Sequence, residues 1–407
     1  MMKILIKREQ SKQACFAERE ESRTKFKIKS FILAAVAFAL VAPAFTACSS
    51  SDDDNKKDNI VSEYTINDNL VANKKAQSKK DVAVLLVAFG STWDNAFKAF
   101  DKTIAAYEAA FPNADVYMSF SSDICINRAS AGENVDDEGN IVKRDYYEPR
   151  YLLHAIGKAQ YSKIYVQSLQ VIPGEEFAAV VASVKKFMNN GYIADAHLDD
   201  AYLAKLSETE SIFLGMPLLN DPDADIPAVA QQLHALYAKE AAQGVVAFMG
   251  HGNPDEYDTY KANVRYTQLE QALQKLSKNY FVGTVDMMDN FKTNVYARMQ
   301  KKGIKSGKIF LHPLMSIDGD HGHNDMGGDD DDNWQDGIGF TPNEEGEVED
   351  TSWKMYFRHL GYDCPEENVI HRGLLELPTI RQVWMNHTQA AIDGEPLDYY
   401  HSKNPEE

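Results

Sequence analysis

The sequence is poor in cysteine and contains no Cys-x-x-Cys pair. Its four cysteines are Cys15, Cys48, Cys125 and Cys364. Zinc ribbons and thioredoxin-type redox sites use closely spaced cysteine pairs, so the sequence excludes both. Cys125 and Cys364 could pair in an oxidising compartment, and the sequence leaves that question open.

Basic residues are also scarce relative to acidic ones. The 407-residue chain has 42 Lys and Arg against 61 Asp and Glu, which gives a formal net charge of -19. Binding to nucleic acid needs clustered Lys and Arg, so no nucleic-acid partner is expected. A solvated acidic surface explains most of this charge, which also suits a protein that handles cations. The 44% of hydrophobic residues is enough to form a sizeable core.

The apolar run at residues 31–45 is too short to span a membrane comfortably. It follows a basic segment and ends in small residues, which is typical of a secretory signal peptide, predicted over residues 1–47. The residues before Cys48 resemble a bacterial lipobox, so we expect Cys48 to carry lipid and to become the mature N-terminus. The alternative is ordinary cleavage beside an incidental cysteine.

Residues 48–80 are predicted to form a lipidated tether and linker. The acidic segment 49–59 resembles the surface-export signal of lipoproteins in the Bacteroides group, and residues 60–80 are polar with little to bury. We therefore expect an exported lipoprotein of the outer membrane, on the periplasmic or surface face, held to the membrane through its lipid anchor.

From residue 81 onward, apolar runs alternate with amphipathic segments, which predicts an α/β fold. The expected strands are 81–91, 115–120, 163–172, 212–219, 244–250, 280–286, 308–317 and 368–375. The expected helices are 95–111, 151–159, 177–188, 255–276, 289–302, 353–360 and 379–392. Acidic, polar insertions are expected at 132–145 and 327–350.

The pattern also repeats within the chain. VAVLLVAFGS at residues 82–91 resembles VVAFMGHGN at 245–253, and SKIYVQSLQVIPGEE at 162–176 resembles GKIFLHPLMSIDGDH at 307–321. In this register Glu176 lies opposite His321, and Phe89 lies opposite His251. The repeat predicts two similar α/β halves with parallel sheets, residues 81–240 and 241–407, facing each other across a cleft.

Three potential metal ligands follow predicted strands of the second half. His251 and His321 each come after an apolar strand and a glycine, and Asp286 ends the strand between them in sequence. Carboxyl ends of parallel strands lie at one edge of a sheet, so the three side chains can converge. Imidazole is the commonest ligand for divalent transition metals, and three ligands leave coordination positions open for transfer or catalysis.

Further polar residues surround these ligands. His323 and Asp325 could orient His321, or Asp325 could cap a helix. Glu175 and Glu176 could accept protons or contact a polar substrate, or simply favour a helix N-terminus. The acidic run 329–332 could supply metal, although such runs are more often solvated loops. Apolar walls for a substrate could come from Phe89, Ser91, Met287, Met288 and Met315.

Four segments together resemble a known family: LLVAFGST from Leu85, VQSLQVIPGEEF from Val166, MGHGNP from Met249 and PLMSIDGDHGHNDM from Pro313. They are similar to the anaerobic sirohydrochlorin cobalt chelatases of the CbiK type, which are class II chelatases. The resemblance extends over about residues 81–387. It implies two α/β halves around a tetrapyrrole cleft and the insertion of Co2+ into sirohydrochlorin, a step of cobalamin synthesis.

The resemblance also assigns roles to residues. It implies that His251 and His321 bind the metal and act in catalysis, and it places Asp286 where the family has a glutamate. The metal is Co2+ as substrate, and Fe2+ or Ni2+ stay open as alternatives. The oligomeric state, including a homo-oligomer, also stays open.

The export signal and the acidic insertion leave an alternative function. The chain could be a surface or periplasmic lipoprotein that binds haem, a corrinoid or a metal without turnover. It could equally be a ferrochelatase or dechelatase in iron and haem handling, since removal of metal would use the same site in reverse.

Overall fold

The computed structural model describes residues 52–132, 134–135, 139–190, 197–258, 260–342 and 351–394. Both predicted halves lie within one compact unit that begins at Lys56. The predicted signal peptide and Cys48 lie outside the described residues. Within the described part of the chain, no helix has both the length and the apolar character needed to cross a membrane.

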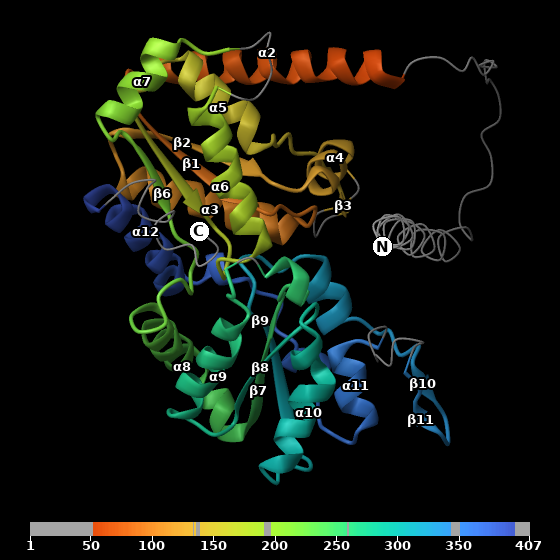
Figure 1. Ribbon diagram of the computed structural model, residues 1–407. Helices are drawn as coiled ribbons and strands as arrows, with labels where there is room; N and C mark the ends of the chain where they lie inside the picture. The colour runs from red at the N-terminus through yellow and green to blue at the C-terminus, as the bar shows by residue number, and fades with distance from the viewer. Residues whose placement is uncertain are drawn as a thin grey trace, which may run out of the picture. The chain divides into compact units, whose positions relative to one another are not determined.

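A four-stranded parallel sheet forms the centre of the first half, in the order β2-β1-β5-β6 (Figure 1). Its strands are β1 (Val82–Ala88), β2 (Ala114–Phe120), β5 (Lys163–Ser168) and β6 (Ile212–Gly215). The accompanying helices are α3 (Asp94–Ala110), α4 (Asp123–Ala131), α5 (Pro149–Lys158), α6 (Glu175–Met188) and α7 (Asp200–Glu208). Side chains of β1 pack into two apolar clusters, one on each face of the sheet, which explains its continuous apolar sequence.

The second half repeats this arrangement with three parallel strands in the order β8-β7-β9. The strands are β7 (Gly244–Gly250), β8 (Tyr280–Thr284) and β9 (Lys308–Pro313). The helices that follow in the chain are α9 (Val264–Gln274), α10 (Lys292–Lys301) and α11 (Trp353–His359). In the first sheet β1 lies between β2 and β5, and in the second sheet β7 lies between β8 and β9 in the same way. The predicted fold of two similar α/β halves is therefore confirmed.

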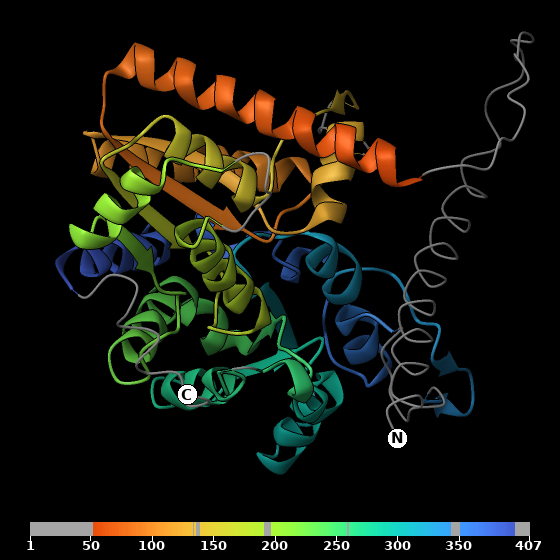
Figure 2. The same ribbon diagram turned by 45° about the horizontal axis from the view of Figure 1, so that its top comes forward.

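Two helices connect the halves more closely than the sequence predicts. Helix α8 (Asp225–Gln243), which was not expected, packs on α9 and β7. The last described helix, α12 (Pro378–Asp393), returns to the first sheet, where it packs on β5 and β6 (Figures 1 and 2). There Trp384 Nε1 donates a hydrogen bond to the carbonyl of Gln170 at 3.0 Å. A division at residue 240 stays a prediction, because helices from both sides of it pack on the other half.

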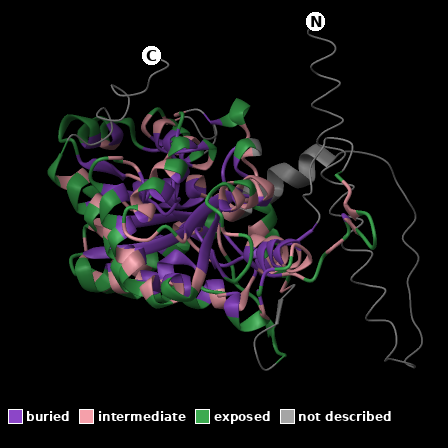
Figure 3. Ribbon diagram, turned by 90° about the horizontal axis from the view of Figure 1, so that it is seen from below, coloured by how far each residue is buried: buried purple, intermediate pink, exposed green. Residues whose placement is uncertain are grey.

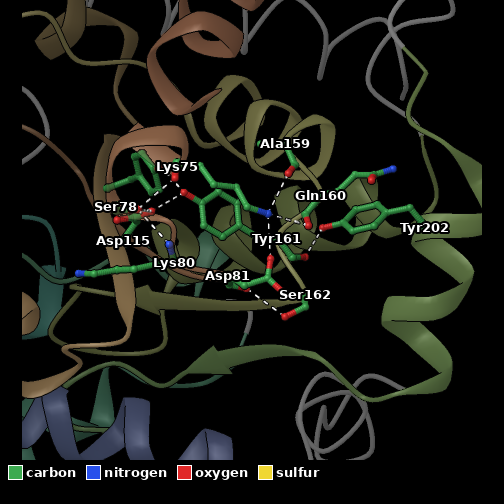
Figure 4. A network of polar contacts seen from close by, with 11 residues as sticks. Lys75, Ser78, Lys80, Asp81, Asp115, Ala159, Gln160, Tyr161, Ser162 and Tyr202 are labelled. Carbon is green, nitrogen blue, oxygen red and sulfur yellow. Dashed lines mark hydrogen bonds and ion pairs between the residues drawn. The ribbon is translucent and has the colours of Figure 1, made fainter. Parts of the chain in front are cut away.

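Helix α2 (Asp52–Ser78) occupies most of the segment predicted to be a tether and linker, and the sequence analysis did not predict a helix there. Its side chains Tyr64 and Val71 lie two turns apart and are buried. Near its end, Lys75 Nζ donates to Asp81 Oδ1 at 2.8 Å and to two carbonyls just after α5 (Figure 4). Two buried residues two turns apart and the partly exposed contacts of Lys75 hold this largely polar helix against the first half.

Several element boundaries differ from expectation. The helix predicted over 255–276 is instead a short 3-10 turn (Asp255–Tyr257) followed by α9. The Asp258 carboxylate explains the break, because it accepts hydrogen bonds from the backbone N–H groups of Ala262 and Asn263 at 2.7 and 3.0 Å. The predicted strand 368–375 makes only one bridge, Leu311 with Val369, before a 3-10 turn.

The two insertions contain small hairpins, β3–β4 (Asn134–Val135, Ile141–Val142) and β10–β11 (Trp334–Gln335, Gly339–Phe340). The strands of the sheets form the buried interior, with exposed residues on the outer helix faces (Figure 3). Cys125 and Cys364 are both free thiols, so the disulfide left open by the sequence does not form in this structure. Burial raises the pKa of the Cys364 thiol to about 12.

Candidate metal and tetrapyrrole site

Loops at the carboxyl ends of the two sheets contact each other directly. From the first half, Trp93 Nε1 donates to Asp320 Oδ1 at 2.6 Å, and the backbone N–H of Glu175 donates to Asn253 Oδ1 at 3.2 Å. Gly174 makes the second contact possible, because a Cβ there would lie 2.4 Å from the Asn253 side chain. The two halves therefore face each other through these ends, as predicted. A tetrapyrrole cleft between them stays a prediction.

His251 comes directly after β7, in a turn that depends on glycine. Gly252 has φ +84°, and a Cβ there would lie 2.9 Å from the Cβ of Met287. His251 Nδ1 lies 2.7 Å from the Gly252 carbonyl and donates to it. This bond leaves the Nε2 lone pair free for a metal ion.

Asp286 lies two residues beyond β8, beside His251. Its backbone N–H donates to the His251 carbonyl at 2.9 Å, and its Oδ2 lies 3.5 Å from His251 Nε2. The pairing of β7 with β8 brings the two residues together, since Gly250 and Thr284 are register partners. The imidazole and the carboxylate are therefore adjacent, and their binding of a metal stays a prediction.

His321 begins a π-helix, His321–Met326, in the loop after β9. Such helices are rare and occur often at functional sites. The His321 and His251 rings lie 5.0 Å apart between centroids, and His321 Nδ1 lies 2.7 Å from Asp325 Oδ2. Burial alone would lower the pKa of His321, but the hydrogen bond and charge of Asp325, with Asp286 and Asp320 nearby, raise it above its ordinary value.

Glu176 joins this group from the other half. It stands in the first turn of α6, and the charges of His251 and His321 act on it directly. Burial raises the pKa of Glu176, the two histidines lower it, and Glu175 and Asp286 raise it, with a net rise. The helix-terminus interpretation and the proton-acceptor interpretation of Glu176 are thus compatible, because the start of α6 is also where the carboxyl meets the histidines.

A second cluster lies partly in the same loop: Asp318, His323 and His371 each offer a ligand atom, and these atoms all lie within 4.8 Å of one another. His371 Nδ1 is 3.0 Å and His323 Nδ1 is 3.4 Å from Asp318 Oδ2. His323 was expected to support His321 but contacts Asp318 and the Gly319 carbonyl instead. No sequence pattern pointed to His371, which stands 48 residues beyond His323 in a segment without a motif.

The remaining residues of the prediction have simpler roles. Asp325 orients His321 through the hydrogen bond to its Nδ1, which is one of the two roles predicted for it. Asp329 forms an ion pair with Lys354 at 2.9 Å, and Asp331 Oδ2 lies 3.3 Å from His359 Nε2, so these two residues of the acidic run contact basic side chains.

Of the residues expected to wall a flat substrate, Phe89 fits best. It follows β1 and is 43% exposed, which is unusual for phenylalanine at the end of a buried strand. Ser91 is buried and accepts a hydrogen bond from the backbone N–H of Trp93 at 3.2 Å. Met287 and Met315 are half-buried against the cores, and the Met288 side chain is outside the description.

Comparison with known proteins adds the family to this geometry. The family model described as cobalt chelatase (CbiK) matches residues 82–342, which include both sheets and the histidines at their ends. The chain belongs to the cobalt chelatase (CbiK) family. This CbiK-family protein is therefore an enzyme, a metal chelatase.

Curated relatives match this CbiK-family chain over most of their own length. It is 26% identical over 318 residues to the sirohydrochlorin cobaltochelatase CbiKC of Nitratidesulfovibrio vulgaris, covering 76% of this chain and 90% of the relative. It is also 26% identical to the sirohydrochlorin cobaltochelatase of Salmonella typhimurium, covering 76% and 96%. Among solved structures, SirB from Bacillus subtilis with Fe3+ covers 78% of this chain and 99% of its own, at 13% identity and a TM-score of 0.42.

Proposed function

We propose that this chain is a sirohydrochlorin cobaltochelatase that inserts Co2+ into sirohydrochlorin, with His251, Asp286 and His321 around the metal. The observation that carries the proposal is the convergence of two imidazoles with a carboxylate at the facing ends of the halves, with ring centroids 5.0 Å apart. Its family membership and the activity for which its relatives are named support the same reaction.

Insertion of a divalent metal requires that the macrocycle lose two pyrrole N–H protons and that the ion shed water. His251 and His321 each keep Nε2 available, because Nδ1 of each is already hydrogen-bonded. These two atoms would hold the Co2+ substrate through few ligands, so that it can be released to the macrocycle. Asp286 would be the third ligand or a base.

Glu176 is a further candidate for proton transfer. Its pKa is raised by burial, which makes its carboxylate a better proton acceptor than an exposed one. It reaches the histidines from the opposite half, so it would act on the other side of a substrate held between the halves. Phe89, exposed at a strand end of the same half, would contact the flat ring.

The test is multiple turnover by the purified full chain. With Co2+, Fe2+ or Ni2+ present, the absorption spectrum of sirohydrochlorin should change over many turnovers of the protein. His251→Ala and His321→Ala should abolish this change while the variants remain folded. His197→Ala, at an exposed position away from the strand ends, is the matched control. Unchanged rates in both site variants would refute the assignment.

The binding-protein alternative uses the same residues without turnover. Its support is the predicted signal peptide and Cys48, which would place the chain outside the cytoplasm, where a captured haem, corrinoid or metal ion would be met. One equivalent of tetrapyrrole bound with no insertion or removal of metal would favour this alternative. Release of metal from a loaded tetrapyrrole would instead favour a dechelatase.

A further inference from the structure

The cluster of Asp318, His323 and His371 is assembled from two separate parts of the chain. Asp318 and His323 belong to the loop and π-helix after β9, while His371 comes from the segment that follows the bridge of Val369 to β9. The His323 and His371 rings stack with centroids 4.6 Å apart and planes at 27°. Both imidazoles therefore present nitrogen atoms to the same carboxylate.

The Asp318 carboxylate is fully buried and only partly satisfied. Its side chain has no exposed area, and Oδ2 is the oxygen that lies near both imidazoles. Its Oδ1 is buried with no hydrogen-bond partner in the described part of the chain. A buried carboxylate charge is costly unless it is compensated, and a cation bound between this carboxylate and the two imidazoles would compensate it.

Residues of the first half hold these ligands in position. The Trp93 ring stacks on His323 with centroids 3.7 Å apart. Asn95 Nδ2 lies 3.4 Å from Asp318 Oδ2 and donates to the Asp318 carbonyl at 3.2 Å. Side chains that orient ligands in this way are a regular part of metal sites.

We propose that Asp318, His323 and His371 form a second divalent-metal site, separate from the set of His251, Asp286 and His321. Two imidazoles and one carboxylate suit Co2+, Ni2+, Fe2+ or Zn2+ and leave positions open for water or exchange. His323 and His321 share the π-helix, so the two sites lie close together in the chain. The inference concerns the ion alone and does not depend on a tetrapyrrole.

The test is a titration of the full chain with Co2+ alone, followed by calorimetry and by the visible absorption of protein-bound Co2+. The wild type should bind two ions. His371→Phe and His323→Phe keep a stacking ring but lose the nitrogen, so each should bind one ion, with the second at least about tenfold weaker. Asp318→Asn should also bind only one ion. If Asp318→Asn does not fold, the two phenylalanine variants still test the site.

The two metal assignments are separable in this experiment. The double variant His251→Ala, His321→Ala should retain one ion, which His371→Phe then removes. If the double variant retains one ion but no longer inserts metal into sirohydrochlorin, the second site is supported independently of the assignment of the first site. Two ions bound by His371→Phe with unchanged affinities, or a single wild-type ion lost in the His251→Ala, His321→Ala variant, would overturn the second site.

Discussion

At the scale of single residues, the chemistry of His321 depends on the carboxylate behind it. Asp325 lies one turn further along the π-helix, 2.7 Å from His321 Nδ1, and so fixes the ring with Nε2 directed away. The same function is served for His251 by the carbonyl of Gly252. A carboxylate binds an imidazole N–H more strongly than a neutral carbonyl does. The two histidines are thus unequal partners for a metal ion.

Replacement of Asp325 should therefore weaken metal binding without unfolding the protein. Asp325→Asn keeps the size of the side chain but removes its charge, and loss of such a supporting group lowers metal affinity by about 10–100-fold. Calorimetric titration with Co2+ measures the change, with Asp336→Asn in the β10–β11 loop as control. Equal affinities in Asp325→Asn and the control would show that Asp325 does not support a metal ligand.

At the scale of elements, β9 carries a buried polar contact to α8. His312 Nε2 lies 2.6 Å from Glu240 Oε2, while His312 Nδ1 is buried without a partner among the described residues. Burial lowers the pKa of His312, more than the hydrogen bond to Glu240 raises it. The imidazole is therefore held neutral between a helix and a strand that the sequence alone did not place together.

This contact predicts a pH dependence of stability. The pKa of His312 lies below its unfolded value of about 6.5, so the unfolded chain binds more protons as the pH falls through that value. The free energy of unfolding should then decrease, by at most about 1.4 kcal/mol per pH unit from this residue.

Urea unfolding at pH 8 and pH 5.5 measures the effect. His312→Gln can still donate to Glu240 but cannot take up the proton, so it should lose less stability than the wild type on acidification. His197→Gln, at an exposed position, should lose as much as the wild type. An equal loss in all three proteins would show that His312 does not contribute.

At the scale of the whole molecule, the predicted lipid anchor would determine where the site meets its ions and tetrapyrroles. We propose that Cys48 is lipidated and that the chain is exported. If so, Cys48→Ala should move the protein from the membrane fraction to the soluble fraction and abolish palmitate labelling. Cys15→Ala is the matched control, because Cys15 precedes the proposed cleavage point. Membrane association that persists in Cys48→Ala would rule out the anchor.

The sequence by itself determined the two α/β halves, because apolar strands punctuated by glycine are local patterns that recur in the chain. It also indicated His251, Asp286 and His321 as neighbours, since each lies in the segment that follows a strand of one parallel sheet. Glu176 was only an open candidate, because its role depends on how the halves face each other. His371 was missed entirely, since nothing near it in sequence resembles a metal site. The tertiary structure decided the positions of Glu176 and His371, as it decided the packing of α2 and α12. In each case the groups that they contact lie far away along the chain.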